Sequence, residues 1–408
     1  MQVMSSILVL GLCFLVLVVE PDGAYGSSRG SLGRNKGAAA PAVDGICAIS
    51  VTPHGYKCEE HEVQTDDGYI LSMQRIPEGR AGGSRGGQKK QPVLIQHGIF
   101  AVSSFFTIGL TFQDGITWLM NSPEQNLPMI LADNGFDVWI ANTRGTQFSR
   151  KHVSLDPARP EYWDWSWDEL VTYDLPAVFG FVFNHTGQKI HYIGHSLGTL
   201  IALTSFSEGH QADQVKSATF LCPIAYLSHL KTELVLLAAK AFVGDVFNCY
   251  DLVSEISGTR PILLLVQFES VFDRSNSDSL LVIQVVLMVF KFVSCFFAVV
   301  RDGVREGVIN KYDYGRDGNL KHYGEAKPAV YNISNIPRDL PIFISHGGID
   351  PLSDVEDVGL LLDLLKLHDV SKLSVQFLKG YAHLDFIMAV NAKDFVYNQI
   401  VQFLKNQQ

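Results

Sequence analysis

Residues 190–199 read Ile-His-Tyr-Ile-Gly-His-Ser-Leu-Gly-Thr, in which a mostly apolar segment leads into Ser196 with Gly194 and Gly198 on either side. A strand that enters such a segment directly predicts a sharp strand-to-helix turn, with the Ser196 hydroxyl projecting above a sheet. Gly194 and Gly198 are expected there because a Cβ at either position would collide with the neighbouring strand or helix. The small and apolar residues 199–207 predict the helix that follows. The pattern indicates a serine nucleophile.

A serine hydroxyl is a weak nucleophile without a general base, and that base needs a carboxylate to fix its tautomer. His383 lies in a loop after the apolar segment 373–378 and before a predicted C-terminal helix, so we predict that it is the base. Asp350 follows the predicted strand 341–345 and two glycines, which makes it the predicted acid. Asp354 is the alternative acid, although it is also placed to cap the next helix.

The tetrahedral intermediate of ester hydrolysis needs backbone N–H donors for its negative oxygen. One predicted donor is the amide of Leu197, at the N-terminus of the helix after the serine, where the helix dipole also favours negative charge. The second is expected from the loop after the predicted strand 92–96, with Ile99 as the first choice and Gly98 as the alternative. We expect His97 to brace this loop by hydrogen bonding rather than to act as a base.

Short apolar segments that alternate with helical stretches predict an α/β protein with a mainly parallel sheet. A hairpin is expected first, with two strands around the turn at 66–68. Because ligands of parallel sheets bind beyond the carboxyl ends of the strands, Ser196 is expected at the functional edge. The predicted buried strands are 92–96, 136–141, 190–193, 218–222 and 341–345.

Several motifs together resemble those of the gastric and lysosomal acid lipases of the α/β-hydrolase fold, and their sequences are most similar to the plant branch of that family. The resemblance runs from about Cys47 to Val243 and from about Gly307 to the C-terminus. The motifs are Gln96-His-Gly-Ile99, Asn142-Thr-Arg-Gly145 with Ser149-Arg150, Trp163-Asp-Trp-Ser-Trp-Asp-Glu-Leu170, Gly194-His-Ser-Leu-Gly-Thr199 and Ala382-His-Leu-Asp-Phe386.

The resemblance implies an α/β-hydrolase that cleaves triacylglycerols or steryl esters and enters the secretory pathway. It implies a triad of Ser196, Asp350 and His383, and it agrees with Ile99 and Leu197 as oxyanion donors. We expect the three tryptophans of the segment 163–170 to pack a structural corner. Asp174 followed by Leu-Pro is expected to cap a helix.

The acidic balance of the chain, with a formal net charge of −10, argues against a nucleic-acid partner. The cysteine spacings match no zinc site, and no His-Glu-x-x-His motif is present. We therefore expect no metal and no organic cofactor. The expected partner is a lipid ester at a lipid–water interface.

The N-terminal residues 1–26 are predicted to be a signal peptide, because the apolar run 7–19 is too short to cross a bilayer and small residues follow it. Residues 27–43 are expected to be a flexible linker. Two sequons predict glycosylation at Asn184 and Asn332. Removal of the signal peptide leaves five cysteines, so at least one thiol is free or pairs elsewhere. The expected destination is the secretory pathway, either secretion or a vacuolar, lysosome-like compartment.

We predict that the hydrolase core is divided into residues 44–222 and 316–408, with a helical cap at 223–315. Within this cap, residues 261–300 depart from the family, and Leu280–Val300 is nearly all apolar. This segment is interpreted as a lid, as a membrane span or as an altered gene model. A span would place Asp350 and His383 across the membrane from Ser196, so no stable span is expected.

These observations predict a serine lipase that acts through an acyl-enzyme. The same triad would equally suit a carboxylesterase for small soluble esters, because only the lid and the pocket distinguish the two. A catalytically silent lipid-binding protein, with a cap that blocks or fails to form the pocket, is the alternative from another class.

Overall fold

The computed structural model describes residues 45–82, 89–98, 114–229 and 308–407, and the backbone of two short strands at 100–101 and 111–112. The predicted signal peptide, the predicted linker and most of the predicted cap, with Leu280–Val300, lie outside these residues. Across the part of the chain that is described, no helix is long and apolar enough to cross a bilayer.

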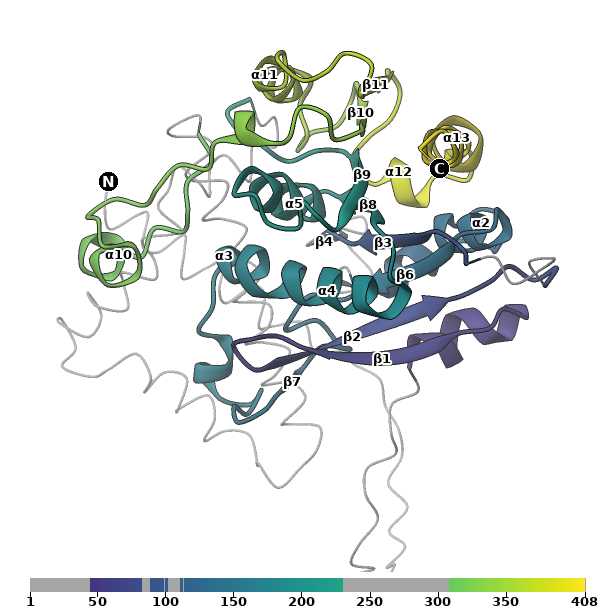
Figure 1. Cartoon of the computed structure of the whole chain (residues 1–408), viewed down its shortest axis with the longest axis horizontal. Coiled ribbons are helices and arrows are strands. Elements are labelled where there is room, and N and C mark those ends of the chain that lie inside the picture. The colour runs from purple at the N-terminus through teal and green to yellow at the C-terminus, as the bar shows by residue number, and fades with distance from the viewer. Residues whose placement is uncertain are drawn as a thin grey trace, which may run out of the picture. The chain divides into compact units, whose positions relative to one another are not determined.

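The centre of the fold is a sheet with strand order β1-β2-β6-β3-β8-β9-β10-β11, in which β7 pairs with β2 (Figure 1). All neighbours from β6 to β11 are parallel, whereas β1, β2 and β7 add antiparallel pairs at one side. A separate pair joins β4 (Phe100–Ala101) to β5 (Thr111–Phe112). The strands of the main sheet are β1 (Glu59–Gln64), β2 (Tyr69–Ile76), β3 (Pro92–Gln96), β6 (Asp137–Ala141), β7 (Lys151–His152), β8 (Ile190–His195), β9 (Val215–Leu221), β10 (Ile342–Gly347) and β11 (Leu373–Leu378).

The predicted strands are present, with small changes at their ends. The segments predicted at 92–96 and 373–378 match β3 and β11 without change, and β1 and β2 surround the predicted turn. β8 continues two residues beyond the predicted end to His195, and β9 begins three residues before the predicted start, at Val215. The extension of β8 arises because His195 is fully buried and its backbone pairs with Leu221 of β9.

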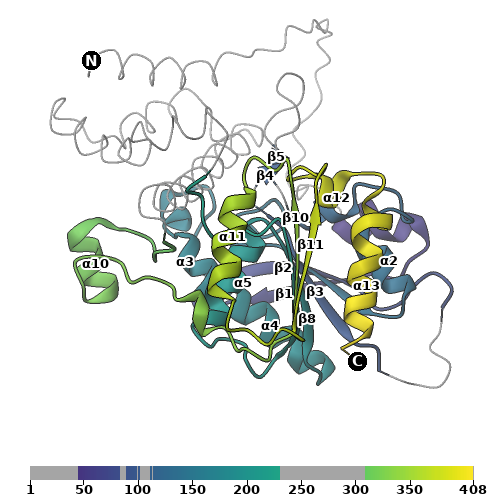
Figure 2. The ribbon, with the colours of Figure 1, turned by 90° about the horizontal axis from the view of Figure 1, so that it is seen from above.

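Helices cover both faces of the sheet (Figure 2). One face carries α3 (Trp167–Glu169), α4 (Leu175–Thr186), α5 (Leu197–Ser207) and α11 (Val355–Leu364), and the other carries α2 (Leu127–Asp133), α12 (Asp385–Met388) and α13 (Asn398–Lys405). The remaining helical elements are α10 (Gly315–Tyr323), η1 (Cys47–Val51), η2 (Thr52–His54), η3 (Gly115–Leu119), η4 (Pro160–Trp163), η5 (Leu170–Asp174), η6 (Ile333–Asn335) and η7 (Lys393–Tyr397).

The sheet separates two hydrophobic cores, because side chains alternate along each strand. Leu94 of β3 faces the core under α4 and α5, whereas its neighbours Val93 and Ile95 face the core under α2 and α13. β10 repeats the pattern, with Ile344 in the first core and Phe343 in the second. Both faces of these parallel strands are buried, which explains why they read as continuous apolar runs in the sequence.

The prediction that Asp174 caps a helix is wrong. The helical segment begins earlier, at Ser166, whose side chain and backbone form a capping box with Glu169. Asp174 has helical backbone angles and makes no cap hydrogen bond. Its carboxylate instead accepts hydrogen bonds from the backbone N–H of Arg144, at 3.0 Å, and from the Arg144 guanidinium, at 2.7 Å. A fully buried guanidinium needs this partner, because an unpaired buried charge is very costly.

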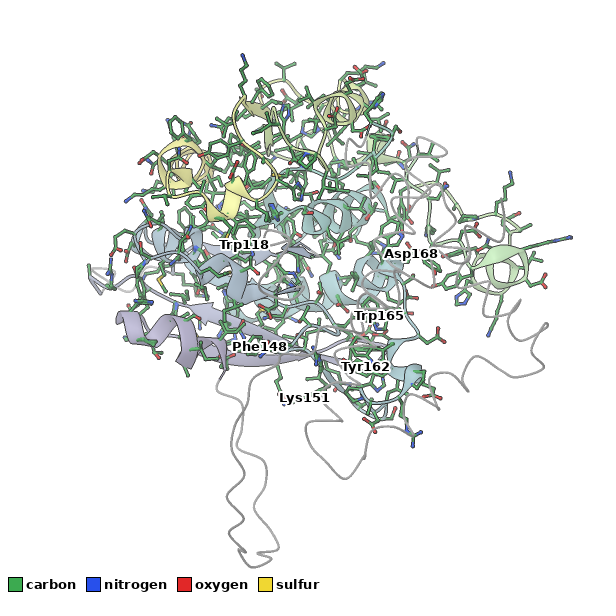
Figure 3. All side chains as sticks on the ribbon, turned by 180° about the vertical axis from the view of Figure 1, so that it is seen from behind. Trp118, Phe148, Lys151, Tyr162, Trp165 and Asp168 are labelled. Atoms are coloured by element: carbon green, nitrogen blue, oxygen red, sulfur yellow. A yellow bond between two sulfur atoms is a disulfide. The ribbon has the colours of Figure 1, made fainter. Side chains whose placement is uncertain are left out.

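The tryptophans of the segment 163–170 pack in the core as predicted, and all three are nearly fully buried. Asp168 lies among them and accepts hydrogen bonds from the Tyr323 and Tyr331 hydroxyls and from the Tyr312 backbone N–H, at 2.8–2.9 Å. Figure 3 labels Tyr162, Trp165 and Asp168 in this region. Asp168 therefore fastens the segment before β10 to α3.

Cys47 and Cys58 form a disulfide, and Cys222 is a free buried thiol among the described cysteines. The free thiol agrees with the odd count expected from the sequence. The disulfide closes a loop of η1 and η2 at the start of the described chain.

Candidate active site

Ser196 occupies the turn between β8 and α5, as the sequence predicts. Its φ of 54° and ψ of −119° lie in a sparsely populated region, which costs roughly 1–3 kcal/mol for a residue with a side chain. A Cβ on Gly194 would lie 2.8 Å from the backbone of Gly198, and a Cβ on Gly198 would lie 2.8 Å from the carbonyl oxygen of Gln96. Both glycines are therefore required by close backbone approach, and the turn stays locked because the Ser196 N–H donates to the Leu221 carbonyl.

His383 lies between β11 and α12, and its Nε2 is 2.8 Å from Ser196 Oγ. The two residues are 187 positions apart in the chain. Both are nearly buried, with 8 % of Ser196 and 6 % of His383 exposed. This distance allows proton transfer from the hydroxyl to the imidazole.

Asp350 follows β10 and contacts the opposite nitrogen of the same imidazole, with 2.9 Å between His383 Nδ1 and Asp350 Oδ2. The carboxylate also accepts hydrogen bonds from the backbone N–H groups of Leu352 and Ser353, both at 2.8 Å. Burial alone would raise the pKa of Asp350, but the His383 charge and these hydrogen bonds outweigh it and lower that pKa below its usual value. An ionised Asp350 favours the tautomer in which Nδ1 carries the proton and Nε2 is free to accept one.

Asp354, the alternative acid, is the N-cap of α11. Its side chain accepts a hydrogen bond from the Glu356 backbone N–H at 2.9 Å. Of the two carboxylates that the sequence offers, Asp350 is therefore the one that contacts His383.

Leu197 is the first residue of α5, so its N–H has no acceptor within the helix and lies beside the Ser196 turn. Ile99, the first choice for the second oxyanion donor, lies outside the described residues. The end of β3 nevertheless approaches the turn closely, since the carbonyl oxygens of Gln96 and His97 lie 2.8 Å and 3.0 Å from the position of a Cβ on Gly198.

Comparison with known proteins identifies the family of this chain. The model of the alpha/beta hydrolase fold matches residues 91–387, and that of the partial alpha/beta-hydrolase lipase region matches residues 48–110. Triacylglycerol lipase 2 of Arabidopsis thaliana is 50% identical over 412 residues, covering 93% of each chain. The chain belongs to the acid lipase family of α/β-hydrolases.

Two further relatives extend the comparison. Triacylglycerol lipase 1 of Arabidopsis thaliana is 34% identical over 390 residues, covering 89% of this chain and 91% of its own length. Gastric triacylglycerol lipase of Homo sapiens is 33% identical over 385 residues, covering 90% of this chain and 92% of its own. The resemblance and the α/β-hydrolase fold inferred from the sequence are thus confirmed, and this acid lipase is an ester hydrolase of the lipase type.

His97 braces the loop after β3, as expected. Its Nε2 accepts a hydrogen bond from the Thr143 backbone N–H at 3.2 Å, so its Nδ1 carries the proton and donates to the Gly98 carbonyl. Burial lowers the pKa of His97 to about 4, although the Gly98 hydrogen bond opposes this shift. A neutral imidazole that bridges two backbone segments fixes the loop from which the second oxyanion donor is expected.

Two contacts of this acid lipase were not predicted from the sequence. The backbone carbonyl of His383 lies 3.0 Å from His195 Nε2 and 3.3 Å from Cys222 Sγ. A backbone carbonyl has no signature in a sequence, so only the position of His195 beside the serine could have drawn attention to it.

Among the described residues, Cys222, Asp350 and His383 form a group of side chains that could bind a metal ion, because their ligand atoms lie within 4.8 Å of one another. Asp350 and His383 are already bonded to each other, and Cys222 lies against the His383 carbonyl. The expectation of a metal-free site remains a prediction.

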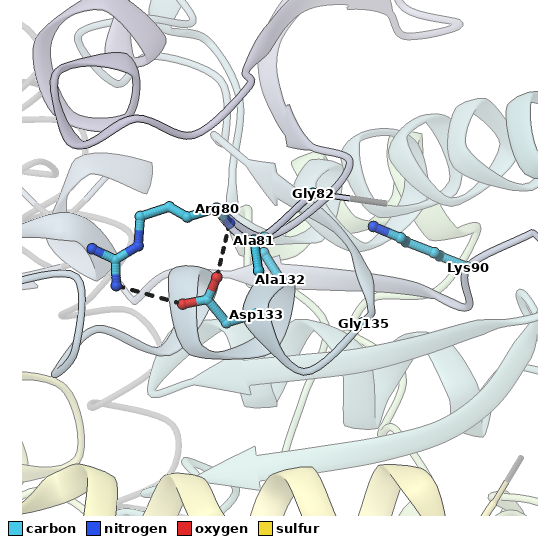
Figure 4. A pocket seen from close by; sticks show the side chains of 8 residues that line it. Arg80, Ala81, Gly82, Lys90, Ala132, Asp133 and Gly135 are labelled. Carbon is cyan, nitrogen blue, oxygen red and sulfur yellow. Dashed lines mark hydrogen bonds and ion pairs between the residues drawn. The ribbon is translucent and has the colours of Figure 1, made fainter. Parts of the chain in front are cut away.

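A surface cavity of about 370 Å³ lies elsewhere, between the loop after β2 and the turn after α2 (Figure 4). Its residues precede β3 and β6, so it is at the amino ends of these parallel strands, opposite the edge that carries Ser196. Its Arg80 pairs with Asp133 and with Glu124. The charges are therefore matched within the protein, and the cavity is separate from the candidate active site.

Proposed function

We propose that this chain hydrolyses the ester bonds of triacylglycerols, with Ser196, His383 and Asp350 as its catalytic triad. The observation that carries the proposal is the continuous chain of contacts from the Ser196 hydroxyl through His383 to Asp350, at 2.8 Å and 2.9 Å. The names of the relatives support the substrate class, since two Arabidopsis proteins and the human gastric protein are called triacylglycerol lipases.

The reaction proceeds in two balanced halves. Ser196 Oγ attacks the ester carbonyl while its proton moves to His383 Nε2, and Asp350 stabilises the resulting imidazolium. The negative oxygen receives the Leu197 N–H and a second N–H from the loop after β3, with Ile99 as the proposed donor and Gly98 as the alternative. His383 then protonates the leaving diacylglycerol oxygen, and the acyl group remains on Ser196.

In the second half, His383 takes a proton from water, the resulting hydroxide adds to the acyl carbonyl, and the same proton returns to Ser196 Oγ as the fatty acid leaves. Every proton that moves passes through Nε2. The near-complete burial of Asp350 and His383 strengthens the attraction between the carboxylate and the imidazolium in both halves.

We also propose that the protein enters the secretory pathway. The Cys47–Cys58 disulfide supports an oxidising compartment. Both predicted glycosylation asparagines are exposed, Asn184 in the last turn of α4 and Asn332 directly before η6. Asn332 is the better acceptor, because it lies in a loop and its side chain already folds back onto the Ser334 backbone N–H of the sequon.

The experiment compares wild type with Ser196→Ala on an emulsified long-chain triacylglycerol, an emulsified steryl ester and a soluble short-chain ester. We expect Ser196→Ala to lose on the order of 10⁴-fold or more in kcat. Ser207→Ala is the matched control, because Ser207 lies on the same helix and donates only to the Thr204 carbonyl.

A fluorophosphonate probe separates the alternatives. The proposal requires that wild type and Ser207→Ala are labelled and Ser196→Ala is not. A wild-type chain that stays unlabelled would show that Ser196 is not activated, as the catalytically silent alternative requires, and preference for the soluble ester over the emulsion would favour a carboxylesterase. Undiminished turnover by Ser196→Ala would overturn the proposed triad.

A further inference from the structure

We infer that His195 is a positioning residue of the hydrolase, which together with Cys222 holds the His383 loop through the His383 backbone carbonyl. This inference rests on the proposed function, because it concerns how the base of that triad is held. It adds two residues outside the triad, both of which contact the His383 backbone carbonyl.

The first support is geometric. His195 Nε2 lies 3.0 Å from the His383 carbonyl oxygen, and the two imidazole rings have centroids 5.0 Å apart. His195 ends β8 and directly precedes Ser196, so nucleophile and base are connected through one residue. Movement of the His383 loop away from β8 would therefore lengthen this hydrogen bond as well as the Ser196–His383 contact.

The second support is the protonation state that the contact demands. A carbonyl oxygen only accepts, so Nε2 must carry the proton, and the opposite nitrogen, Nδ1, is an acceptor without a partner in the described part of the chain. The ring is fully buried, and burial lowers the pKa of His195 to about 3. The charge of protonated His383 lowers this pKa further, and His97 also lowers it, whereas the Asp350 carboxylate raises it. His195 thus remains a neutral donor in acidic solution and places no second positive charge beside the imidazolium.

The third support is a second donor on the same carbonyl. Cys222 Sγ lies 3.3 Å from the His383 oxygen, and the thiol is fully buried. Cys222 directly follows β9, the strand beside β8, and its φ of 49° is a left-handed conformation that a residue with a side chain rarely adopts. Its backbone N–H donates to the Ser345 carbonyl of β10 at 2.9 Å, which fixes this conformation. Donors from two neighbouring strands therefore meet at one atom of the loop, although the Cys222 thiol also lies close to the Asp350 carboxylate.

The test compares substitutions that keep the donor with substitutions that remove it. His195→Gln places an amide N–H near the position of Nε2, whereas His195→Met fills similar space without a donor. Cys222→Ser and Cys222→Ala form the corresponding pair. The matched control is His191→Met, because His191 is equally buried on β8 but contacts Ser217 rather than the triad.

The measurements are kcat and KM on a soluble short-chain ester, the rate of fluorophosphonate labelling, and the thermal unfolding midpoint. We expect His195→Met to lower kcat and the labelling rate by about 10- to 100-fold with KM within twofold, because a small displacement of a catalytic group has that effect. His195→Gln should recover most of the loss. Cys222→Ala should give a smaller loss, since a thiol is a weak donor, and the double variant should be less than additive.

Three results would overturn the inference. His195→Met with wild-type kcat would show that the contact does not position the base. His195→Gln as impaired as His195→Met would show that packing, not donation, matters. An equal loss in His191→Met would show a general effect of histidine burial on β8. An unlabelled wild type would instead refute the proposed function, so the two failures are distinguishable.

Discussion

Gly198→Ala is the change that tests most directly whether the oxyanion loop and the serine turn must touch. Gly198 is the second residue of α5, and an added Cβ would lie 2.8 Å from the Gln96 carbonyl oxygen and 3.0 Å from that of His97. Restoring an ordinary contact of 3.4 Å requires movements of about 0.6 Å and 0.4 Å. The atoms that must move are backbone atoms, so the loop after β3 has to shift as a whole.

Two free-energy terms act on the stability of this variant. Replacement of a helical glycine by alanine stabilises a helix by about 0.8–1 kcal/mol. Overpacking against backbone costs roughly 1–3 kcal/mol. The net loss in free energy of unfolding is therefore expected to be small, about 0–2 kcal/mol. Activity should fall much more, because loss of one oxyanion donor costs about 10²–10³ in kcat and a partial displacement should cost about 10- to 100-fold.

Gly180→Ala is the matched control. Gly180 lies within α4, and nothing lies within 4 Å of an added Cβ there. We expect a gain of about 0.5–1 kcal/mol and unchanged kcat. The assays are chemical unfolding and turnover of a soluble ester. A Gly198→Ala protein with wild-type kcat would refute the reasoning, because it would show that the loop tolerates the shift or contributes nothing to the oxyanion.

Three further changes probe the acid, the disulfide and the Asp168 contacts. Asp350→Asn should lower kcat by on the order of 10⁴-fold. The lowered pKa of Asp350 should stabilise the wild-type protein above about pH 4, and this stability should be lost as the pH falls below that value. Unfolding curves at several pH values would measure the loss, and equal acid sensitivity of wild type and variant would contradict it. Replacement of Cys47 and Cys58 by serine should cost about 3 kcal/mol in unfolding free energy for a separation of 11 residues, and the difference should vanish under reducing conditions. Asp168→Asn should lower the free energy of unfolding by about 2–3 kcal/mol, because hydrogen bonds to a charged group are worth about 1.5–3 kcal/mol each. An unchanged thermal unfolding midpoint would count against the role of Asp168 in fastening the segment before β10.

The parts of the fold that were predictable from the sequence are those that depend on local pattern. Strands β3 and β11 were predicted without error at their ends, and the Ser196 turn follows from two glycines and an apolar strand. Asp350 and His383 were likewise predicted from the strands that precede them, and the family motifs imply the same residues. Each of these signals lies within about ten consecutive residues, where side-chain type and backbone geometry are directly coupled.

The interactions that were not predictable join residues that are far apart or have a backbone atom as one partner. Asp174 has the local signature of a helix cap, yet it pairs with Arg144, 30 residues away, because burial of a guanidinium outweighs a cap. The sequence around Asp168 does not indicate its hydrogen-bond donors, because they lie 144–163 residues further along the chain. The His195 contact ends on a carbonyl oxygen, which every residue possesses.

The order of the strands explains how the proposed triad assembles, although its serine and histidine are 187 positions apart. The neighbouring strands β3, β8, β9, β10 and β11 all end at the same edge of the sheet, and the loops or turns after them carry, in the same order, His97, Ser196, Cys222, Asp350 and His383. Neighbouring parallel strands are about 4.8 Å apart, so the sheet sets the spacing of these groups before any side chain is chosen. Activity and sheet register are therefore coupled: a change that shifts β10 against β9 displaces Asp350 relative to Ser196, even when it lies far from both side chains.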